Sequence, residues 1–328
     1  MWRETMRNGY VRAYLLFALH DTGVLEALRA APDGLTTGEL ADRLGLDGKR
    51  LEHVLTYAKL SDEVLAQTGD RWRLGERGAW AFEPRTMHLL YNNVGAYSCI
   101  LSELVPVLKK EKVYGTDFVR RGDYLAIGTR GVTVESHDGI MSEIRRLGIR
   151  TFGDLGCGSA HLLVKFCREA PDIKGVGVDI SEGALTSARD TIGAADMASR
   201  IRLVLGDVGQ PETYADKVQD VELFVCIAVL HEFLRDGEQG VLDVLARMRK
   251  CFPGKYLILG EFDRLPPESY NEVPLDVRFR YLFYQELMHP LSNQGLMSRA
   301  DWIRTFETAG VEVLSVQKRN LDIYLLKL

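Results

Sequence analysis

Cysteine is scarce in this sequence. The 328 residues hold five cysteines, an odd number, and none of them forms a CxxC pair. These counts argue against a disulfide framework and suit a reducing compartment. Long apolar runs are missing as well, and the opening residues MWRETMRNGY lack the cleavage pattern of a secretory signal. We therefore expect a cytoplasmic protein that has no membrane partner.

A surplus of basic residues is also absent. The net charge is −5, so no general attraction draws the chain to nucleic acid. The hydrophobic fraction of 46% and the charged fraction of 27% are ordinary for a globular enzyme. The chain is long enough for a small and a large domain, and it shows no internal repeat or low-complexity tract.

The first part of the chain, residues 1–81, has apolar residues at helical spacing and then a helix–turn–helix pattern. Thr36 or Thr37 can cap a short helix, and Asp47 can cap a second one. The segments VLAQ and RWRL then form a predicted hairpin. Together these elements predict a winged-helix-like domain, a type of domain that often reads DNA.

The charge of this segment opposes DNA binding. Residues 36–75 contain six basic and seven acidic side chains, so the unit lacks the basic surface that phosphate contacts require. A packing or dimerisation role is favoured over DNA recognition.

After a helical stretch over residues 82–150, the pattern changes to short β-rich runs that alternate with helices. Such alternation predicts βαβ units, and hence an α/β fold with a doubly wound, mostly parallel sheet over residues 151–328. The last two runs lie close enough in sequence to form an antiparallel edge. The β-rich runs are TFGDLG, GVGVDI, IRLVLGD, VELFVCIAVL, KYLILGE, VEVLSV and LDIYLLKL.

The segment DLGCGSAH, residues 154–161, follows the first of these strands and opens a helix. A glycine-rich turn at this point lets a ligand approach the backbone, as in nicotinamide dehydrogenases. Two residues oppose that dehydrogenase: His161 occupies the sixth position of GxGxxG, and the charge of Asp154 would repel a pyrophosphate. S-adenosylmethionine suits the turn better, because it carries an ammonium and a sulfonium and no phosphate.

Two more carboxylates follow the next two strands. Asp179 in GVGVDIS can accept hydrogen bonds from ribose hydroxyls, and Asp207 in LVLGDV can accept one from an adenine amino group. Together with Asp154 they lie where open sheets bind ligands. Helix capping would explain any one of these residues, but it explains their joint order poorly.

With DLGCGSA, GVGVDIS, LVLGDV and the strand VELFVCIAVL, residues 151–328 resemble the class I S-adenosylmethionine-dependent methyltransferases. The resemblance implies a seven-stranded sheet, with a small adjustment at Ala160, where many members have a third glycine. Residues 1–81 resemble the dimerisation domain that precedes this fold in small-molecule methyltransferases, which implies a homodimer, and residues 82–150 become a linker that helps to form the acceptor pocket. The implied cofactor contacts are Asp154, Gly156, Gly158, Asp179, Ile180, Asp207, Val208 and Cys226.

The segment CIAVLHE places His231 and Glu232 where the fourth apolar strand ends. VLHEF resembles the VLHDW stretch of small-molecule O-methyltransferases, which implies that His231 is a general base. A neutral imidazole suits that task, because the usual pKa of histidine is about 6.5. The plainer alternative is that His231 packs beneath the next helix and that Glu232 is solvated.

A helix is predicted from Pro274 to Pro290. Arg278, Gln285 and His289 recur at helical spacing along one stripe, together with a tyrosine. The stripe is either solvated or faces the acceptor pocket. In the second case His289 could meet the two ionisable groups that follow the fourth strand.

Two histidines and a carboxylate make a facial site for iron or zinc. The set His231, Glu232 and His289 resembles that of the metal-dependent C-methyltransferases of α-keto acids, such as phenylpyruvate C-methyltransferase. It implies a small α-keto acid as substrate, methylated beside its ketone through a metal-stabilised enolate. Arg278 is our candidate for binding the substrate carboxylate, ahead of Arg145 and Arg280.

Adjacent residues such as His231 and Glu232 diverge on a helix, so this metal site requires a loop or a first turn after the strand. Two hypotheses stand beside it. One is a metal-free O-methyltransferase in which His231 is the base. The other is a winged-helix regulator that senses S-adenosylmethionine, and it predicts salt-dependent DNA binding.

Overall fold

This computed structural model describes the backbone of residues 2–318 and 321–328, without the side chains of residues 2–5, 62, 130–135, 276, 277 and 280. The chain splits into two compact units. The first comprises Met1–Cys99 and Arg120–Val132, and the second comprises Ile100–Val119 and Thr133–Leu328. The stretch 82–150, which we predict to be a linker, is thus shared between the two units. The functional division at residues 81 and 150 stays a prediction.

The first unit is mainly helical. The predicted helix pair and hairpin are confirmed: Thr36 caps one helix in a capping box with Glu39, and Asp47 caps the other by accepting from the Arg50 amide. Trp72, fully buried, lies at the centre of the core. The small antiparallel sheet has the order β1-β3-β2. The elements are α1 (Trp2–Asp21), α2 (Val24–Arg29), β1 (Leu35–Thr36), α3 (Thr37–Leu44), α4 (Gly48–Asp62), β2 (Leu65–Thr68), β3 (Arg71–Leu74), η1 (Gly78–Phe82), α5 (Pro84–Met87), η2 (His88–Ala96) and α8 (Gly122–Gly128).

The second unit is built on a seven-stranded sheet of order β6-β5-β4-β7-β8-β10-β9. Neighbouring strands from β6 to β8 are parallel, and only β10 pairs antiparallel, with β8 and with β9. This confirms the predicted α/β class with its antiparallel edge. The strands are β4 (Thr151–Leu155), β5 (Lys174–Asp179), β6 (Ile201–Leu205), β7 (Leu223–Ile227), β8 (Tyr256–Glu261), β9 (Glu312–Gln317) and β10 (Asp322–Lys327).

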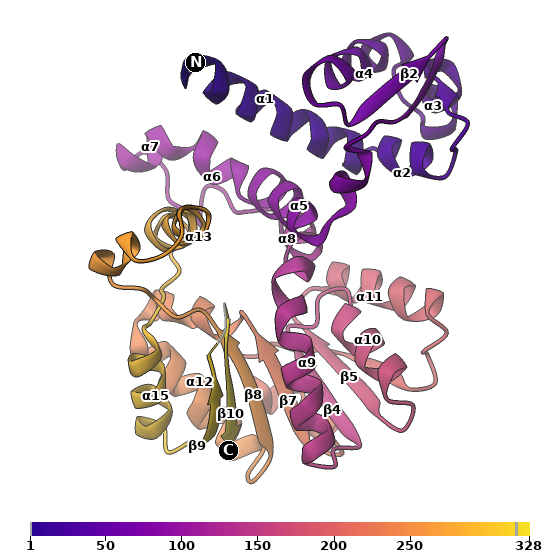
Figure 1. Cartoon of the computed structure of the whole chain (residues 1–328). Coiled ribbons are helices and arrows are strands. Elements are labelled where there is room, and N and C mark those ends of the chain that lie inside the picture. The colour runs from indigo at the N-terminus through magenta and orange to yellow at the C-terminus, as the bar shows by residue number, and fades with distance from the viewer. Residues whose placement is uncertain (1, 319–320) are drawn as a thin grey trace. The chain divides into compact units, whose positions relative to one another are not determined.

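Helices cover both faces of this sheet (Figure 1). On one face α9 (Arg130–Arg146), α10 (His161–Glu169) and α11 (Glu182–Ala194) enclose an apolar core. On the other face α12 (Glu238–Cys251) and α15 (Arg299–Thr308) enclose a second core. Every residue of β4 is buried, as expected for a central parallel strand.

The remaining elements of the second unit are short. The helix predicted from Pro274 to Pro290 is present: the chain is helical from Leu275 through a π-helical segment to Leu291, one residue past the predicted stop. No helix among the described residues is both long and apolar enough to cross a bilayer. The short elements are α6 (Ser98–Ser102), which begins in the first unit, α7 (Leu104–Leu108), η3 (Pro211–Thr213), η4 (Ala215–Val218), η5 (Leu230–Asp236), η6 (Pro267–Asn271), α13 (Leu275–Tyr281), η7 (Leu282–Met288) and α14 (His289–Leu291).

Candidate active site

The carboxyl ends of β4 to β8 meet at one edge of the sheet, because these strands are parallel. The chain proceeds outward from β4 to β6 and then returns to β7 on the other side of β4. The order of strands therefore reverses between β4 and β7, and open α/β sheets bind their ligands at such a reversal. The residues predicted for the site follow these strand ends.

The loop after β4 has the backbone shape that its glycines allow. Gly156 and Gly158 have φ of 76° and 52°, in the left-handed region. A Cβ on Gly156 would lie 2.8 Å from Cγ2 of Val229, so only glycine fits there. Ala160 is also left-handed, with φ of 62°, at the N-cap of α10. Alanine at position 160 therefore strains the backbone, in addition to being larger than the glycine that many members have there.

Asp154 is buried beneath this loop. Burial, with the nearby charge of Asp179, raises the pKa of the Asp154 carboxyl to about 7. Within the described part of the chain, no donor forms a hydrogen bond to this carboxylate. A buried carboxylate in this state is stabilised by a cationic group, such as the ammonium of a methionyl ligand.

Asp179 and Asp207 follow the next two strands, and both accept hydrogen bonds from backbone amides of nearby loops. Asp179 accepts hydrogen bonds from the amides of Gly158 and Ser181, both at 2.9 Å. Asp207 accepts one from the amide of Gly209 at 2.8 Å. Loop capping is therefore part of the role of both residues. An ionised carboxylate has about four acceptor positions, so each keeps capacity for a ligand hydroxyl or amino group.

The apolar residues predicted beside the cofactor differ in exposure. The side chain of Ile180 is 69% exposed, which is unusual for isoleucine and leaves a surface for a flat ring. Val208 and Cys226 are buried. Burial, together with the charges of Glu261 and Asp154, raises the pKa of Cys226 well above its ordinary value. Cys226 is therefore a neutral packing residue at the end of β7.

His231 lies in a buried pair with Glu261, the last residue of β8. The ring Nδ1 is 2.9 Å from Oε2 of Glu261, and the backbone amide of His231 donates to Oε1 at 3.2 Å. Because an ionised carboxylate only accepts, Nδ1 is the donor in this contact, and in the neutral form of the ring the lone pair then lies on Nε2. The turn that carries His231 follows Ala228, whose φ of 54° is a strained backbone of the kind found at functional sites.

His289 lies against His231, with ring centroids 5.2 Å apart. It directly follows η7, a π-helical segment in which the His289 amide donates to the carbonyl of Tyr284. The same carbonyl is 2.7 Å from Nδ1 of the His289 ring. A carbonyl only accepts, so here too Nδ1 is the donor and Nε2 has the lone pair. The predicted meeting of these two histidines is found in the structure.

Two aromatic rings stand beside the histidine pair. Phe262 lies 6.0 Å from the ring of His231 and 6.1 Å from that of His289. Tyr284 lies 5.9 Å from His289 and nearly parallel to Phe262, with centroids 6.5 Å apart. Offset pairs have centroids about 4.5–7 Å apart, so this pair lies at the wide end of that range. Both side chains are only half-buried.

The structure does not gather every predicted residue. Among the described side chains, no three His, Cys, Asp or Glu residues come together in a group that could hold a metal ion. Glu232 is half-buried beside His231. Arg278 donates from Nη2 to the carbonyl of Asn271 at 3.2 Å, while its Nε is buried without a hydrogen bond to the described residues. The side chain of Arg280 lies outside the described residues, and Arg145 bonds the Glu169 carbonyl.

Glu261 and Phe262 lie beside the histidines and were not predicted from the sequence. The signal for them resembles the one that revealed His231, since the apolar strand KYLILGE also ends in an ionisable residue. Glu261 is fully buried, and an unpaired buried carboxylate is costly, so a partner was to be expected. Sequence alone does not say which of the nearby histidines is that partner.

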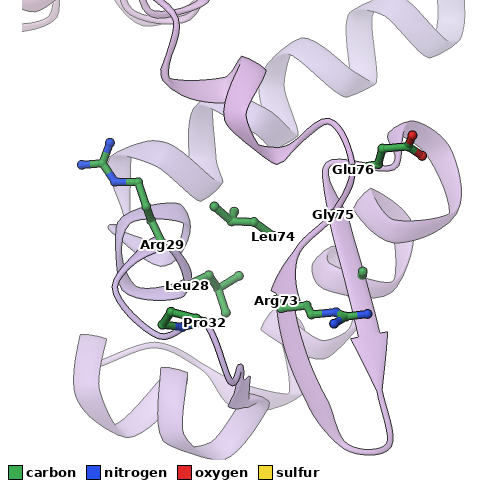
Figure 2. A pocket seen from close by; sticks show the side chains of 8 residues that line it. Leu28, Arg29, Pro32, Arg73, Leu74, Gly75 and Glu76 are labelled. Atoms are coloured by element: carbon green, nitrogen blue, oxygen red, sulfur yellow. The ribbon is translucent and has the colours of Figure 1, made fainter.

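A hollow of about 490 Å³ in the first unit has a different character. Figure 2 shows Leu28, Pro32 and Leu74 along its wall, with the guanidinium groups of Arg29 and Arg73 pointing to opposite sides. Its charged groups do not converge on one point. The converging ionisable groups are those of the second unit.

The comparison with known proteins agrees with this placement. Residues 153–251 match a family described as a methyltransferase domain. Over 314 residues the chain is 26% identical to the 2-ketoarginine methyltransferase of Streptomyces arginensis, and the alignment covers 94% of this chain and 87% of that protein.

Solved structures share the fold over nearly the whole chain. The mitomycin 7-O-methyltransferase MmcR has a TM-score of 0.65 at 16% identity and covers 98% of this chain and 95% of its own. Human N-acetylserotonin methyltransferase in complex with SAM has a TM-score of 0.67 at 17% identity, with 99% and 96% covered. PigF with SAH has 0.68 at 16% identity, with 99% and 98% covered.

These structures show the fold alone, whereas the matched domain contains the glycine loop and the three carboxylates. The buried, unneutralised Asp154 fits the cationic end of the methyl donor. This chain is therefore an enzyme, an S-adenosylmethionine-dependent methyltransferase with the class I fold.

Proposed function

We propose that this methyltransferase adds the methyl group to the carbon next to the ketone of a small α-keto acid. The observation that carries the proposal is the pair of buried histidines, whose ring centroids are 5.2 Å apart. Each ring donates from Nδ1 to a fixed acceptor, so each has its lone pair on Nε2. The related 2-ketoarginine methyltransferase, named for an α-keto acid, supports the same class of substrate.

The histidine pair suits a metal ion. Metal-binding histidines usually donate their other ring N–H to a carboxylate or a backbone carbonyl, and Glu261 and the Tyr284 carbonyl are such acceptors. We propose that His231 and His289 would hold iron or zinc together with Glu232, after rotation of the half-buried Glu232 side chain. When bound there, the ion would polarise the ketone oxygen and favour loss of the neighbouring proton.

The chain's own residues would bind the rest of the keto acid. Arg278 has a buried Nε with no hydrogen bond to the described residues, as expected for a guanidinium that binds a carboxylate. The half-exposed faces of Phe262 and Tyr284 suit a flat substrate side chain. A guanidinium group, as in 2-ketoarginine, and an aromatic ring both stack on such faces.

A second candidate is metal-free O-methylation. The buried pair of His231 and Glu261 supports it, because a carboxylate that holds Nδ1–H leaves Nε2 as a base for a hydroxyl proton. His289 would then be a wall residue of the acceptor pocket.

The deciding experiment uses purified full-length enzyme, S-adenosylmethionine labelled in its methyl group, and a panel of α-keto acids and phenols. NMR of the product distinguishes a methyl group on carbon from one on oxygen. We expect carbon methylation that is lost after chelator treatment and restored by iron(II) or zinc. His289→Ala should abolish the restoration, and His53→Ala, at an exposed position, should not. Full activity of the chelated enzyme, with methyl on oxygen, would establish the second candidate instead.

We also propose that the enzyme is a homodimer through residues 1–81, on the resemblance of that segment to dimerisation domains. Light scattering of the full chain and of a chain that begins at residue 82 tests this. A mass of two chains for both species would place the interface elsewhere.

A further inference from the structure

Residues 261–265, which begin with the last residue of β8, contact both histidine-bearing elements. Its first residue, Glu261, holds the ring and the amide of His231. Its last residue, Leu265, is paired with Gln285 in η7, four positions before His289. One short segment thus connects the two histidines, which come from distant parts of the chain.

Gln285 forms this second connection with both ends of its side-chain amide. Its Oε1 accepts from the Leu265 amide at 3.3 Å, and its Nε2 donates to the Leu265 carbonyl at 3.4 Å. The side chain is 5% exposed, so the solvated position considered from sequence is wrong. An ionised carboxylate cannot donate and an apolar side chain can do neither, so neither of them keeps both hydrogen bonds.

The segment itself is firmly held. Asp263 accepts from the Arg299 amide at 2.7 Å and pairs with the Arg299 guanidinium at 2.9 Å. Arg299 also binds Asp322, a fully buried residue of β10. The amide of Arg264 donates to the Met297 carbonyl at 3.0 Å. Residues 261–265 are therefore fixed to β10 and to the start of α15, and they form a rigid base.

The π-helical segment η7 needs contacts outside the helix to maintain its shape. An i→i+5 turn is less favourable than an α-helical one and persists where other contacts maintain it. One residue more or less in a helix rotates all later side chains by about 100°. If η7 relaxed to an α-helix, His289 would turn away from His231. Gln285 lies inside η7, where its two hydrogen bonds oppose this change.

We propose that residues 261–265 are a common anchor that sets the separation of His231 and His289, and that Gln285 is the positioning residue that ties His289 to it. The inference rests on the proposed function only in treating the two histidines as the reaction centre. It requires no contact between Gln285 and the substrate.

The test compares Gln285→Leu and Gln285→Glu with the matched variant Gln239→Leu, at an exposed position of α12. The first readout is nitrogen NMR of histidine-labelled protein without ligands. In wild type and Gln239→Leu, the His289 ring should hold its proton on Nδ1. In both Gln285 variants the two ring protonation forms should mix, as the contact with the Tyr284 carbonyl loosens.

The second readout is binding of zinc alone by calorimetry and of S-adenosylmethionine separately. Zinc should bind about tenfold more weakly to Gln285→Leu, within the range of about 10–100-fold seen when a residue that orients a metal ligand is lost. S-adenosylmethionine should bind within about twofold of wild type, because the substitution leaves the Asp154 loop unchanged. Gln285→Glu, which keeps an acceptor for the Leu265 amide, should lie between Gln285→Leu and wild type.

An unchanged His289 ring in both Gln285 variants overturns the anchor, whatever the activity. So does equal weakening of zinc and S-adenosylmethionine binding, since that indicates general loss of structure. The proposed function fails on a different result, full zinc affinity and full activity of His289→Ala. The NMR readout stays informative in that case, because it needs neither metal nor turnover.

Discussion

The predicted cofactor side and the proposed acceptor side of this site are built differently. On the cofactor side each functional group lies within or next to a short segment at one strand end, as in DLGCGSAH and GVGVDIS. On the acceptor side the groups come from distant segments: His231 and Glu261 are 30 positions apart, and His289 follows after a π-helical turn. The cofactor side is thus local, because each group comes from one short segment. The acceptor side is assembled, because its groups come from segments far apart in the sequence.

The difference extends to the family match. The matched methyltransferase domain, residues 153–251, contains the cofactor loop and His231 but stops before Glu261 and His289. The local part of the site is thus the part that the family description covers. Glu261 and His289, which belong to the assembled part, lie beyond it.

The largest expected loss of activity comes from removing the His231 side chain from the acceptor side. His231→Ala should lower kcat by about 10²–10⁴, the usual contribution of a proton-transferring or ligand-orienting histidine. Binding of S-adenosylmethionine, measured by calorimetry, should stay near wild type. His53→Ala, an exposed histidine in the first unit, is the control. Equal losses in cofactor binding and kcat would show that the two sides are not separate.

A smaller effect should follow from changing only the support of that histidine. Glu261→Gln keeps the shape but offers the His231 ring an amide in place of a carboxylate, so Nδ1–H is held less firmly. We expect kcat to fall about 10–100-fold, as for other partners that orient a histidine. Steady-state kinetics with both substrates measure it. A KM change for S-adenosylmethionine alone would instead assign Glu261 to the cofactor side.

How much of this could be predicted follows from the same contrast. The alternation of strands with helices, the capped helices of the first unit and the glycine loop come from local pattern, and the structure has them. The ring contact of His231 and His289 was an expectation from helical spacing, but its geometry depends on η7, which sequence spacing does not reveal. The helical run ends at Leu291, one residue past the stop predicted at Pro290, so the ends of this helix were predictable and its π-helical turn was not.

The cofactor side should respond to pH through Asp154. Its pKa is raised to about 7 without ligand, whereas a cationic ligand binds the ionised form. Affinity for S-adenosylmethionine should therefore fall about tenfold per pH unit below 7, the proton-competition limit of one group. In Asp154→Asn the affinity should be about tenfold weaker at pH 7.5, since a hydrogen bond to a charged group contributes about 1.5–3 kcal/mol. Calorimetry from pH 5.5 to 7.5 measures both.

Folding has the opposite dependence on pH in the absence of ligand. Between the ordinary pKa of 3.8 and about 7, the folded chain binds a proton at Asp154 that the unfolded chain does not. Its contribution to the free energy of unfolding is thus lost as pH rises through that window. Asp154→Asn should remove this slope from urea unfolding curves. A slope that persists in the variant would assign the effect to another group.

The smallest expected effect comes from replacing one alanine on each side of the site by glycine. Ala160, on the cofactor side, and Ala228, before His231, are both left-handed, with φ of 62° and 54°. Replacing either by glycine relieves about 1–2 kcal/mol of backbone strain. It also costs about 0.4–1 kcal/mol through the freer unfolded chain. Both variants should therefore be slightly more stable in thermal unfolding.

Activity should distinguish the two alanine variants. Ala160→Gly restores the residue that many class I methyltransferases have in this loop, so its kcat should equal wild type. Ala228→Gly adds freedom to the turn that carries His231, whose place depends on distant contacts with Glu261. Its kcat should fall a few-fold, because small displacements of a reacting group are costly. Equal kinetics for both variants would mean that the strain at Ala228 is incidental, and that Glu261 alone places His231.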